Sequence, residues 1–118
     1  MKEKLVALME QYKSQGLVKG NELLLPPEST FQLVAELERL NVIITGVYGW
    51  YYVKPDNPKW IAEDTTVFLY VGDDIDDTDD PVHESAARIK DYIAHHLHEN
   101  TAFLSLLLDI PNEWGIVY

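Results

Sequence analysis

An acidic run is the part of this sequence whose residue types most directly suggest chemistry. Six of the eight residues from position 73 to position 80 are aspartates, namely Asp73, Asp74, Asp76, Asp77, Asp79 and Asp80. Carboxylate oxygens bind Ca²⁺ and Mg²⁺, and clustered carboxylates lower their mutual repulsion by sharing a cation. An acidic surface can also attract a basic protein. The run is therefore a solvated loop, a docking surface or a cation site.

The spacing of the run excludes the helix–loop–helix calcium motif. A loop that starts at Asp73 places Glu84 at the twelfth position, as that motif requires. However, Ile75 then occupies the third position, where an oxygen ligand is needed, and Thr78 occupies the sixth, where glycine is needed. No other register restores the glycine. A looser calcium or magnesium site stays open as an alternative.

A second group of candidate metal ligands lies on a predicted helix that follows the run. Asp91, His95 and His98 are spaced by four and three residues, fall on one helix face and could bind zinc or nickel. The simpler interpretation is that Glu84–Arg88 and Asp91–His95 are surface pairs four residues apart. Ligands on an exposed helix also lack the hydrogen-bond partners that orient metal ligands. We predict no cofactor and no metal ligand here, with a metal-binding or sensing domain as an alternative function.

No pattern in the chain indicates catalysis. The sequence has no cysteine, which removes thiolate catalysis and disulfides together. It also contains no glycine-rich phosphate loop and no nucleophile-elbow context around a serine. We therefore assign no catalytic residue and predict that the protein is not an enzyme.

The charge balance limits the classes of partner. The formal net charge is −11, and without the six aspartates of the run the other 14 acidic residues still outnumber the 9 lysines and arginines. Such a surface repels nucleic-acid phosphates and gives no polybasic membrane anchor. The 118 residues are 47% hydrophobic, which predicts one globular domain over residues 1–118. With no membrane-spanning run and no secretory leader pattern, we expect a cytoplasmic protein.

An aromatic strand is the third informative segment. Residues 42–53 are rich in β-branched and aromatic side chains, which predicts a strand. On a period of two, Gly46 shares one strand face with Tyr48, Trp50 and Tyr52, whereas Gly49 lies on the other face. Glycine within a strand indicates a bulge or a close backbone approach. The alternative is an aromatic face that binds a partner, which Trp60 and Tyr70 would extend.

The predicted elements give an α+β fold with a mainly antiparallel sheet of about four strands and three helices, in the order ααββαββ. The predicted helices cover residues 2–15, 29–40 and 81–99, the last of them capped by Asp80 with Pro81 at its first position. The predicted strands cover residues 42–53, 65–71, 102–110 and 114–118. A long hairpin loop is expected over residues 54–64, and residues 17–25 form either a short strand or a buried connection.

One segment resembles a known group of proteins. A helix that ends in Leu40-Asn41, followed by Val42-Ile43-Ile44-Thr45-Gly46-Val47-Tyr48-Gly49-Trp50, is similar to segments in small immunity proteins of bacterial polymorphic toxin systems. The shared pattern is a hydrophobic strand that leads into two glycines and an aromatic residue, and it covers about a tenth of the chain. The resemblance implies a protein that binds and blocks a cognate toxin.

The resulting hypothesis is a small acidic inhibitor of a basic, nuclease-like toxin. A nuclease needs a cationic surface to hold phosphates, and an acidic inhibitor can cover that surface. The predicted electrostatic half of the binding site is Asp73, Asp74, Asp76, Asp77, Asp79 and Asp80, and the predicted aromatic anchors are Trp50, Tyr52 and Trp60. A structural or regulatory subunit of a larger assembly is a further alternative.

Overall fold

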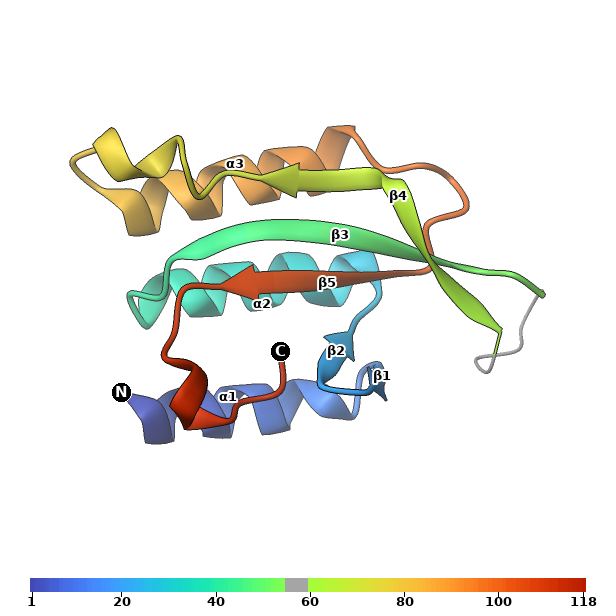
Figure 1. The fold of residues 1–118 in the computed structure, drawn as a ribbon, viewed down its shortest axis with the longest axis horizontal. Coiled ribbons are helices and arrows are strands. Elements are labelled where there is room, and N and C mark those ends of the chain that lie inside the picture. The colour runs from blue at the N-terminus through green and yellow to red at the C-terminus, as the bar shows by residue number, and fades with distance from the viewer. Residues whose placement is uncertain (55–59) are drawn as a thin grey trace.

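The computed structural model describes residues 1–54 and 60–118, and it confirms the α+β class (Figure 1). These residues form three α-helices and five β-strands in two antiparallel sheets. The helices are α1 (Lys2–Lys13), α2 (Pro27–Arg39) and α3 (Pro81–His95). The strands are β1 (Leu17–Lys19), β2 (Glu22–Leu24), β3 (Ile44–Tyr52), β4 (Ile61–Tyr70) and β5 (Phe103–Leu108).

The main sheet has three strands in the order β4–β3–β5, not the four that the sequence analysis predicts. The expected last strand, residues 114–118, does not form. Asn112–Trp114 is a 3₁₀ turn, and Gly115 has a φ of 63°, which turns the chain out of an extended path. The tail is bonded to β2 through its last residue, because the Leu23 N–H donates to the Tyr118 carbonyl at 3.0 Å.

The segment left open by the sequence, residues 17–25, contains the β1–β2 hairpin. Gly20, with a φ of 61°, lies in the turn between its strands. An isolated bridge between Leu25 and Leu104 then ties the hairpin to β5. The element order is therefore αββαββαβ in place of the predicted ααββαββ.

Strand β4 begins at Ile61, earlier than predicted. The expected loop over residues 54–64 is shorter, and its residues 55–59 lie outside the described part of the chain. Residues 65–67 form a bulge, because Tyr48 pairs with Phe68 while the next residue of β3, Gly49, pairs with Asp64. The bulge predicted within the glycine-containing strand occurs beside Gly46, where Ile44 pairs with Leu108 and Gly46 with Leu107, so that Thr45 of β3 is the extra residue.

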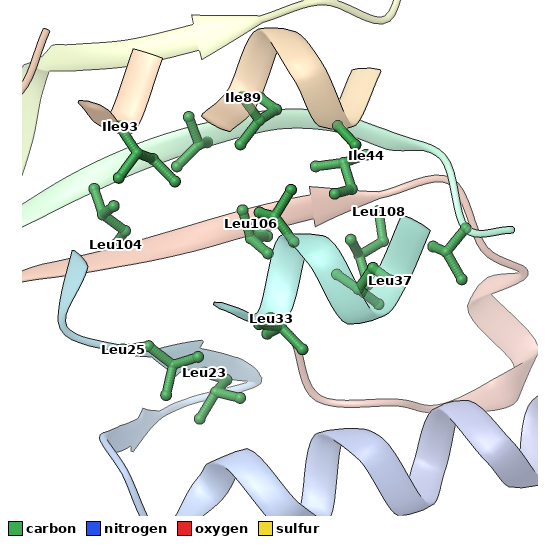
Figure 2. Packing of buried hydrophobic residues seen from close by; sticks show 14 of the residues in the cluster. Leu23, Leu25, Leu33, Leu37, Ile44, Ile89, Ile93, Leu104, Leu106 and Leu108 are labelled. Atoms are coloured by element: carbon green, nitrogen blue, oxygen red, sulfur yellow. The ribbon is translucent and has the colours of Figure 1, made fainter. Parts of the chain in front are cut away.

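Helices α2 and α3 lie against one face of the main sheet, as Figure 1 shows. Each contributes an apolar stripe, and these stripes pack on Ile44 and Val47 of β3 and on alternate residues of β5 (Figure 2). The cluster includes Leu33 and Leu37 of α2, Ile89 and Ile93 of α3, and Leu106 of β5. Helix α1 contributes the predicted stripe Leu5, Leu8, Met9 and Tyr12, all of them buried.

All three helices differ from the predicted bounds, and α1 ends at Lys13 rather than at residue 15. Helix α2 begins at Pro27 rather than at Ser29, and the hydroxyl of Thr30 donates to the carbonyls of Leu25 and Pro26. Helix α3 begins as predicted, with the Asp80 carboxylate accepting from the His83 N–H at 3.1 Å. It ends at His95, four residues before the predicted end.

The second face of the main sheet carries the aromatic side chains of β3. Tyr48 and Trp50 form a smaller buried cluster with Leu24, Ile61 and Phe103. The β1–β2 hairpin is hydrogen-bonded to this face. The Tyr48 hydroxyl donates to Glu22, and the Lys19 ammonium donates to the Ile61 carbonyl at 3.3 Å. One part of the aromatic face is therefore covered by the chain itself.

Candidate partner-binding surface

The acidic loop, residues 73–80, connects β4 to α3. Its backbone is folded, since the N–H groups of Asp74 and Ile75 both donate to the Val71 carbonyl at 3.1 Å. Ile75 lies in a short 3₁₀ turn and packs into the main core. This buried anchor holds the loop against the protein while the aspartates on both sides of it stay exposed.

Two of the six aspartates have structural roles. The Asp74 carboxylate lies 3.2 Å from the Arg88 guanidinium, which also pairs with Glu84 at 2.9 Å. Asp80 caps α3, a contact typically worth about 1 kcal/mol. These contacts restrict what Asp74 and Asp80 can offer a partner.

The remaining four aspartates form the exposed charge of the loop. They are Asp73, Asp76, Asp77 and Asp79. Within the described ranges 1–54 and 60–118, none of the four makes a side-chain hydrogen bond or an ion pair. These residues are exposed and carry four negative charges over seven residues, which favours the approach of a basic surface.

The predicted aromatic anchors lie in different environments. Trp50 is only 8% exposed, and its indole N–H donates to the Ser105 hydroxyl at 3.0 Å. Tyr52 is half-buried and packs edge-on against Phe103, with ring centroids 5.6 Å apart. Trp60 is 49% exposed, with the Lys54 ammonium 4.5 Å from its ring centroid. Trp50 thus belongs to the protein's own packing, and Trp60 is the exposed member of this set.

The structure exposes an aromatic pair, of which the sequence analysis named Tyr70 as an extension of the aromatic face and did not name Phe68. Phe68 and Tyr70 of β4 are 51% and 48% exposed. They pair across the sheet with Tyr48 and Gly46, so they lie on the same sheet face as the aromatic residues of β3. Side chains alternate between the two sheet faces along β4, so this pair could have been identified if the face covered by the helices had been known.

Tyr70 links the aromatic pair to the acidic loop. Its side chain lies over Gly72, so that a methyl group at Gly72 would collide with the Tyr70 ring and hydroxyl. The loop begins one residue later, at Asp73. Phe68, Tyr70 and the four exposed aspartates therefore form one stretch of surface at the end of β4, which we call the aromatic–acidic surface.

The histidine–aspartate face of α3 is divided by the end of the helix. Asp91 and His95 form the predicted pair at 3.1 Å. His98 lies beyond the last helical turn, where its Nδ1 is 3.3 Å from the Asp64 carboxylate. Among residues 1–54 and 60–118, no three histidine or acidic side chains gather in a way that could hold a metal ion.

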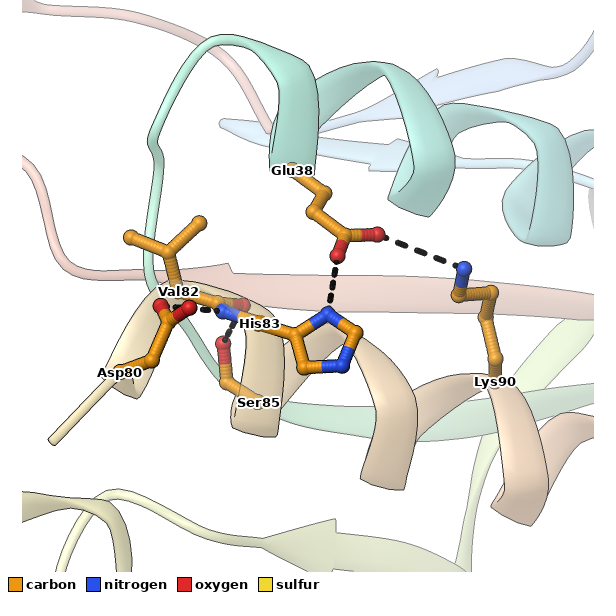
Figure 3. A network of polar contacts seen from close by, with 6 residues as sticks. All are labelled: Glu38, Asp80, Val82, His83, Ser85 and Lys90. Carbon is orange, nitrogen blue, oxygen red and sulfur yellow. Dashed lines mark hydrogen bonds and ion pairs between the residues drawn. The ribbon is translucent and has the colours of Figure 1, made fainter. Parts of the chain in front are cut away.

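A network between α2 and α3 joins groups that are far apart in the sequence (Figure 3). Glu38 Oε2 lies 2.7 Å from His83 Nδ1, and Glu38 Oε1 lies 3.4 Å from the Lys90 ammonium. The hydrogen bond to His83 lowers the pKa of Glu38, with a smaller contribution from Lys90. The same hydrogen bond and the charge of Glu38 raise the pKa of His83. The network therefore stabilises the contact between the two helices in a pH-dependent way.

This network predicts a pH window of added stability. Glu38 stabilises the fold above its ordinary pKa of 4.5, and that contribution disappears as the pH falls through the lowered pKa. His83 stabilises it below its ordinary pKa of 6.5, and that contribution disappears as the pH rises through the raised pKa. The loss of unfolding free energy in Glu38→Gln should therefore be greatest between pH 4.5 and pH 6.5.

Urea denaturation of the wild type and of Glu38→Gln across about pH 4–9 measures this effect. The matched control is Glu36→Gln on the same helix, which loses only an exposed pair with Arg39. Because arginine does not titrate in this range, the loss of unfolding free energy caused by Glu36→Gln should not decline above pH 6.5. A pH-independent difference between Glu38→Gln and the wild type would contradict the proposed pairing.

Among the helices of the described residues, none has the length and apolar character needed to cross a membrane. Comparison of the chain with protein-family models, with curated proteins and with solved structures finds no match.

Proposed function

We propose that this protein is a non-enzymatic, cytoplasmic inhibitor that binds and blocks a basic protein, in the manner of an immunity protein. The observation that carries the proposal is the aromatic–acidic surface. Four aspartates without a hydrogen-bond or ion-pair partner among the described residues adjoin two half-exposed aromatic side chains. The resemblance of residues 40–50 to immunity proteins supports the same function.

The two halves of the surface serve different steps of binding. Exposed carboxylates steer a cationic partner and set its orientation, which mainly raises the association rate. Aromatic side chains desolvate in the contact and slow dissociation. A nuclease toxin would supply the opposite charge, because its catalytic surface must hold phosphates.

The ordered backbone of the acidic loop favours this function over simple solubilisation. Ile75 is buried and Tyr70 is packed over Gly72, so the aspartates are held near one another in a defined arrangement. A partner that binds a pre-ordered loop loses less conformational entropy than one that must order it. The loop is therefore suited to a specific contact.

Affinity capture from the native host tests the proposal. The tagged protein is compared with a fourfold variant in which Asp73, Asp76, Asp77 and Asp79 are replaced by asparagine. Asp74 and Asp80 are retained because they pair with Arg88 and cap α3. We expect one basic protein to be retained by the wild type at low and moderate salt, and to be lost or reduced with the fourfold variant.

A matched control keeps the same net charge as the fourfold variant. It replaces four exposed acids outside the loop, as Glu3→Gln, Glu99→Gln, Asp109→Asn and Glu113→Gln. Retention of the partner by this control would assign the effect to the position of the charges. The proposal would be overturned if both variants lost the partner equally, or if the tagged wild-type protein were recovered without any partner.

A further inference from the structure

A groove between β4 and α3 adjoins the acidic loop. It has a volume of about 220 Å³ and is lined by Leu69, Val71, Asp74, Arg88, Asp91, Tyr92 and His96. Leu69 and Val71 pack against the main core and give the groove an apolar base. Asp74 connects its rim to the acidic loop. We call this feature the β4–α3 groove.

Two stacked rings at the end of α3 belong to the lining of the groove. Tyr92 and His96 lie one helical turn apart, with ring centroids separated by 5.5 Å and an interplanar angle of 26°. Tyrosine faces attract cations, and the planar guanidinium of arginine also stacks on aromatic rings. The groove therefore combines an apolar base with a surface suited to a flat cation.

The charge at the groove is negative despite the presence of Arg88. The Arg88 guanidinium is paired with Asp74 and Glu84, at 3.2 Å and 2.9 Å. Asp91 adds a third carboxylate, which is largely exposed and whose contact in the described part of the chain is His95. Two carboxylates thus pair with the guanidinium, and Asp91, which lines the groove without contacting Arg88, is the acid best placed to pair with an incoming cation.

We propose that the β4–α3 groove receives an arginine side chain of the basic partner. The aliphatic stem would lie over Leu69 and Val71, the guanidinium would stack on Tyr92 and His96, and Asp91 would accept its hydrogen bonds. This inference rests on the proposed function and adds a specificity site beside the aromatic–acidic surface. Lysine fits less well, because its ammonium is a hydrated point charge that does not stack.

Amide-resolved NMR titration of the whole chain tests this site. The probe is the blocked peptide Gly-Arg-Gly, with Gly-Lys-Gly as a control for charge and Gly-citrulline-Gly as a control for shape. At about 150 mM salt, long-range attraction to the acidic surface is largely screened. We expect the arginine peptide to produce saturable shifts in residues 69–71 and 88–96, with a dissociation constant on the order of 1–10 mM.

Two variants test the residues of the groove. Asp91→Asn and Tyr92→Leu should each raise the dissociation constant of the arginine peptide about fivefold or more. Asp109→Asn, which makes the same charge change at an exposed position after β5, should leave binding unchanged. If Tyr92→Leu fails to fold, Asp91→Asn still tests the groove, because the Asp91 side chain is largely exposed and its replacement should not disturb folding.

The outcomes separate this inference from the proposed function. The site is supported if the arginine peptide produces chemical-shift changes confined to the groove, if the lysine peptide produces weaker ones and if the citrulline peptide produces none. Equal effects of the arginine and lysine peptides, shifts centred on residues 73–80, or no saturation would overturn it. If the wild type captures a basic partner but the peptide titration fails, the groove alone is rejected. If the capture itself fails, the proposed function is rejected.

Discussion

Replacing Gly49 with alanine is expected to lower the free energy of unfolding by about 1–3 kcal/mol. An ideal Cβ at this position would lie 2.7 Å from Cγ1 and 2.8 Å from Cβ of Val67, which is completely buried. Such overlap must displace β3 from the bulge of β4, because Val67 belongs to the bulge and cannot move freely. Urea denaturation monitored by tryptophan fluorescence measures the loss.

A double-mutant cycle tests the reason for that loss. Val67→Ala removes the atoms that the new methyl group would meet, at the cost of a small cavity. The double variant should then be more stable than the sum of the two single effects predicts, by about 0.5–3 kcal/mol. Additive effects would contradict a direct collision and would place the cost of Gly49→Ala elsewhere.

Truncation of the aromatic pair is expected to have the largest effect on binding. Phe68→Ala and Tyr70→Ala should each raise the dissociation constant of the captured basic partner about 30-fold, as is typical of aromatic anchors. Both side chains are about half exposed, so their loss should change the stability of the free protein little. Isothermal titration calorimetry with the purified partner measures the change.

Phe31→Ala is the matched control for this prediction. Phe31 is 40% exposed and lies on α2, which covers the opposite face of the main sheet. The control should bind as the wild type does. A similar loss of affinity in Phe31→Ala, or none in Phe68→Ala and Tyr70→Ala, would remove the aromatic pair from the binding surface.

Much of the fold follows from periodicity and from strong local signals. The stripe of α1 and the cap of α3 are recognisable because they depend on residues close together in the chain. The ending of α2 is another local signal, since Asn41 adopts a φ of 59° directly after the helix. The division of β3 into two faces from Val47 onward also follows from its alternation, and the register of the sheet shifts beside both Gly46 and Gly49.

Elements that depend on distant contacts could not be predicted in this way. The first part of β4 contains Ala62, Glu63 and Asp64, which have low strand propensity, and pairing with β3 overrides that preference. The tail at residues 114–118 has the composition of a strand, yet Gly115 adopts a left-handed conformation there. The error in β4 thus arises where pairing overrides local preference, and the error in the tail arises from the conformation of a single glycine.

The candidate surface shows the same division between local and distant information. The acidic loop and the role of Asp80 are evident in the sequence, because charge and capping are local properties. The burial of Trp50 depends on the β1–β2 hairpin, and the contact between Glu38 and His83 joins residues 45 positions apart. The exposure of Phe68 likewise depends on which sheet face the helices cover.

The association rate of the captured basic partner tests the central claim most directly. Stopped-flow measurements compare the wild type, the fourfold aspartate variant and the charge-matched control over a range of salt concentrations. The fourfold variant should associate at least about tenfold more slowly at low salt, with a flatter salt dependence, while the control stays close to the wild type. Equal rates for the fourfold variant and the wild type would show that the acidic loop is not the docking site.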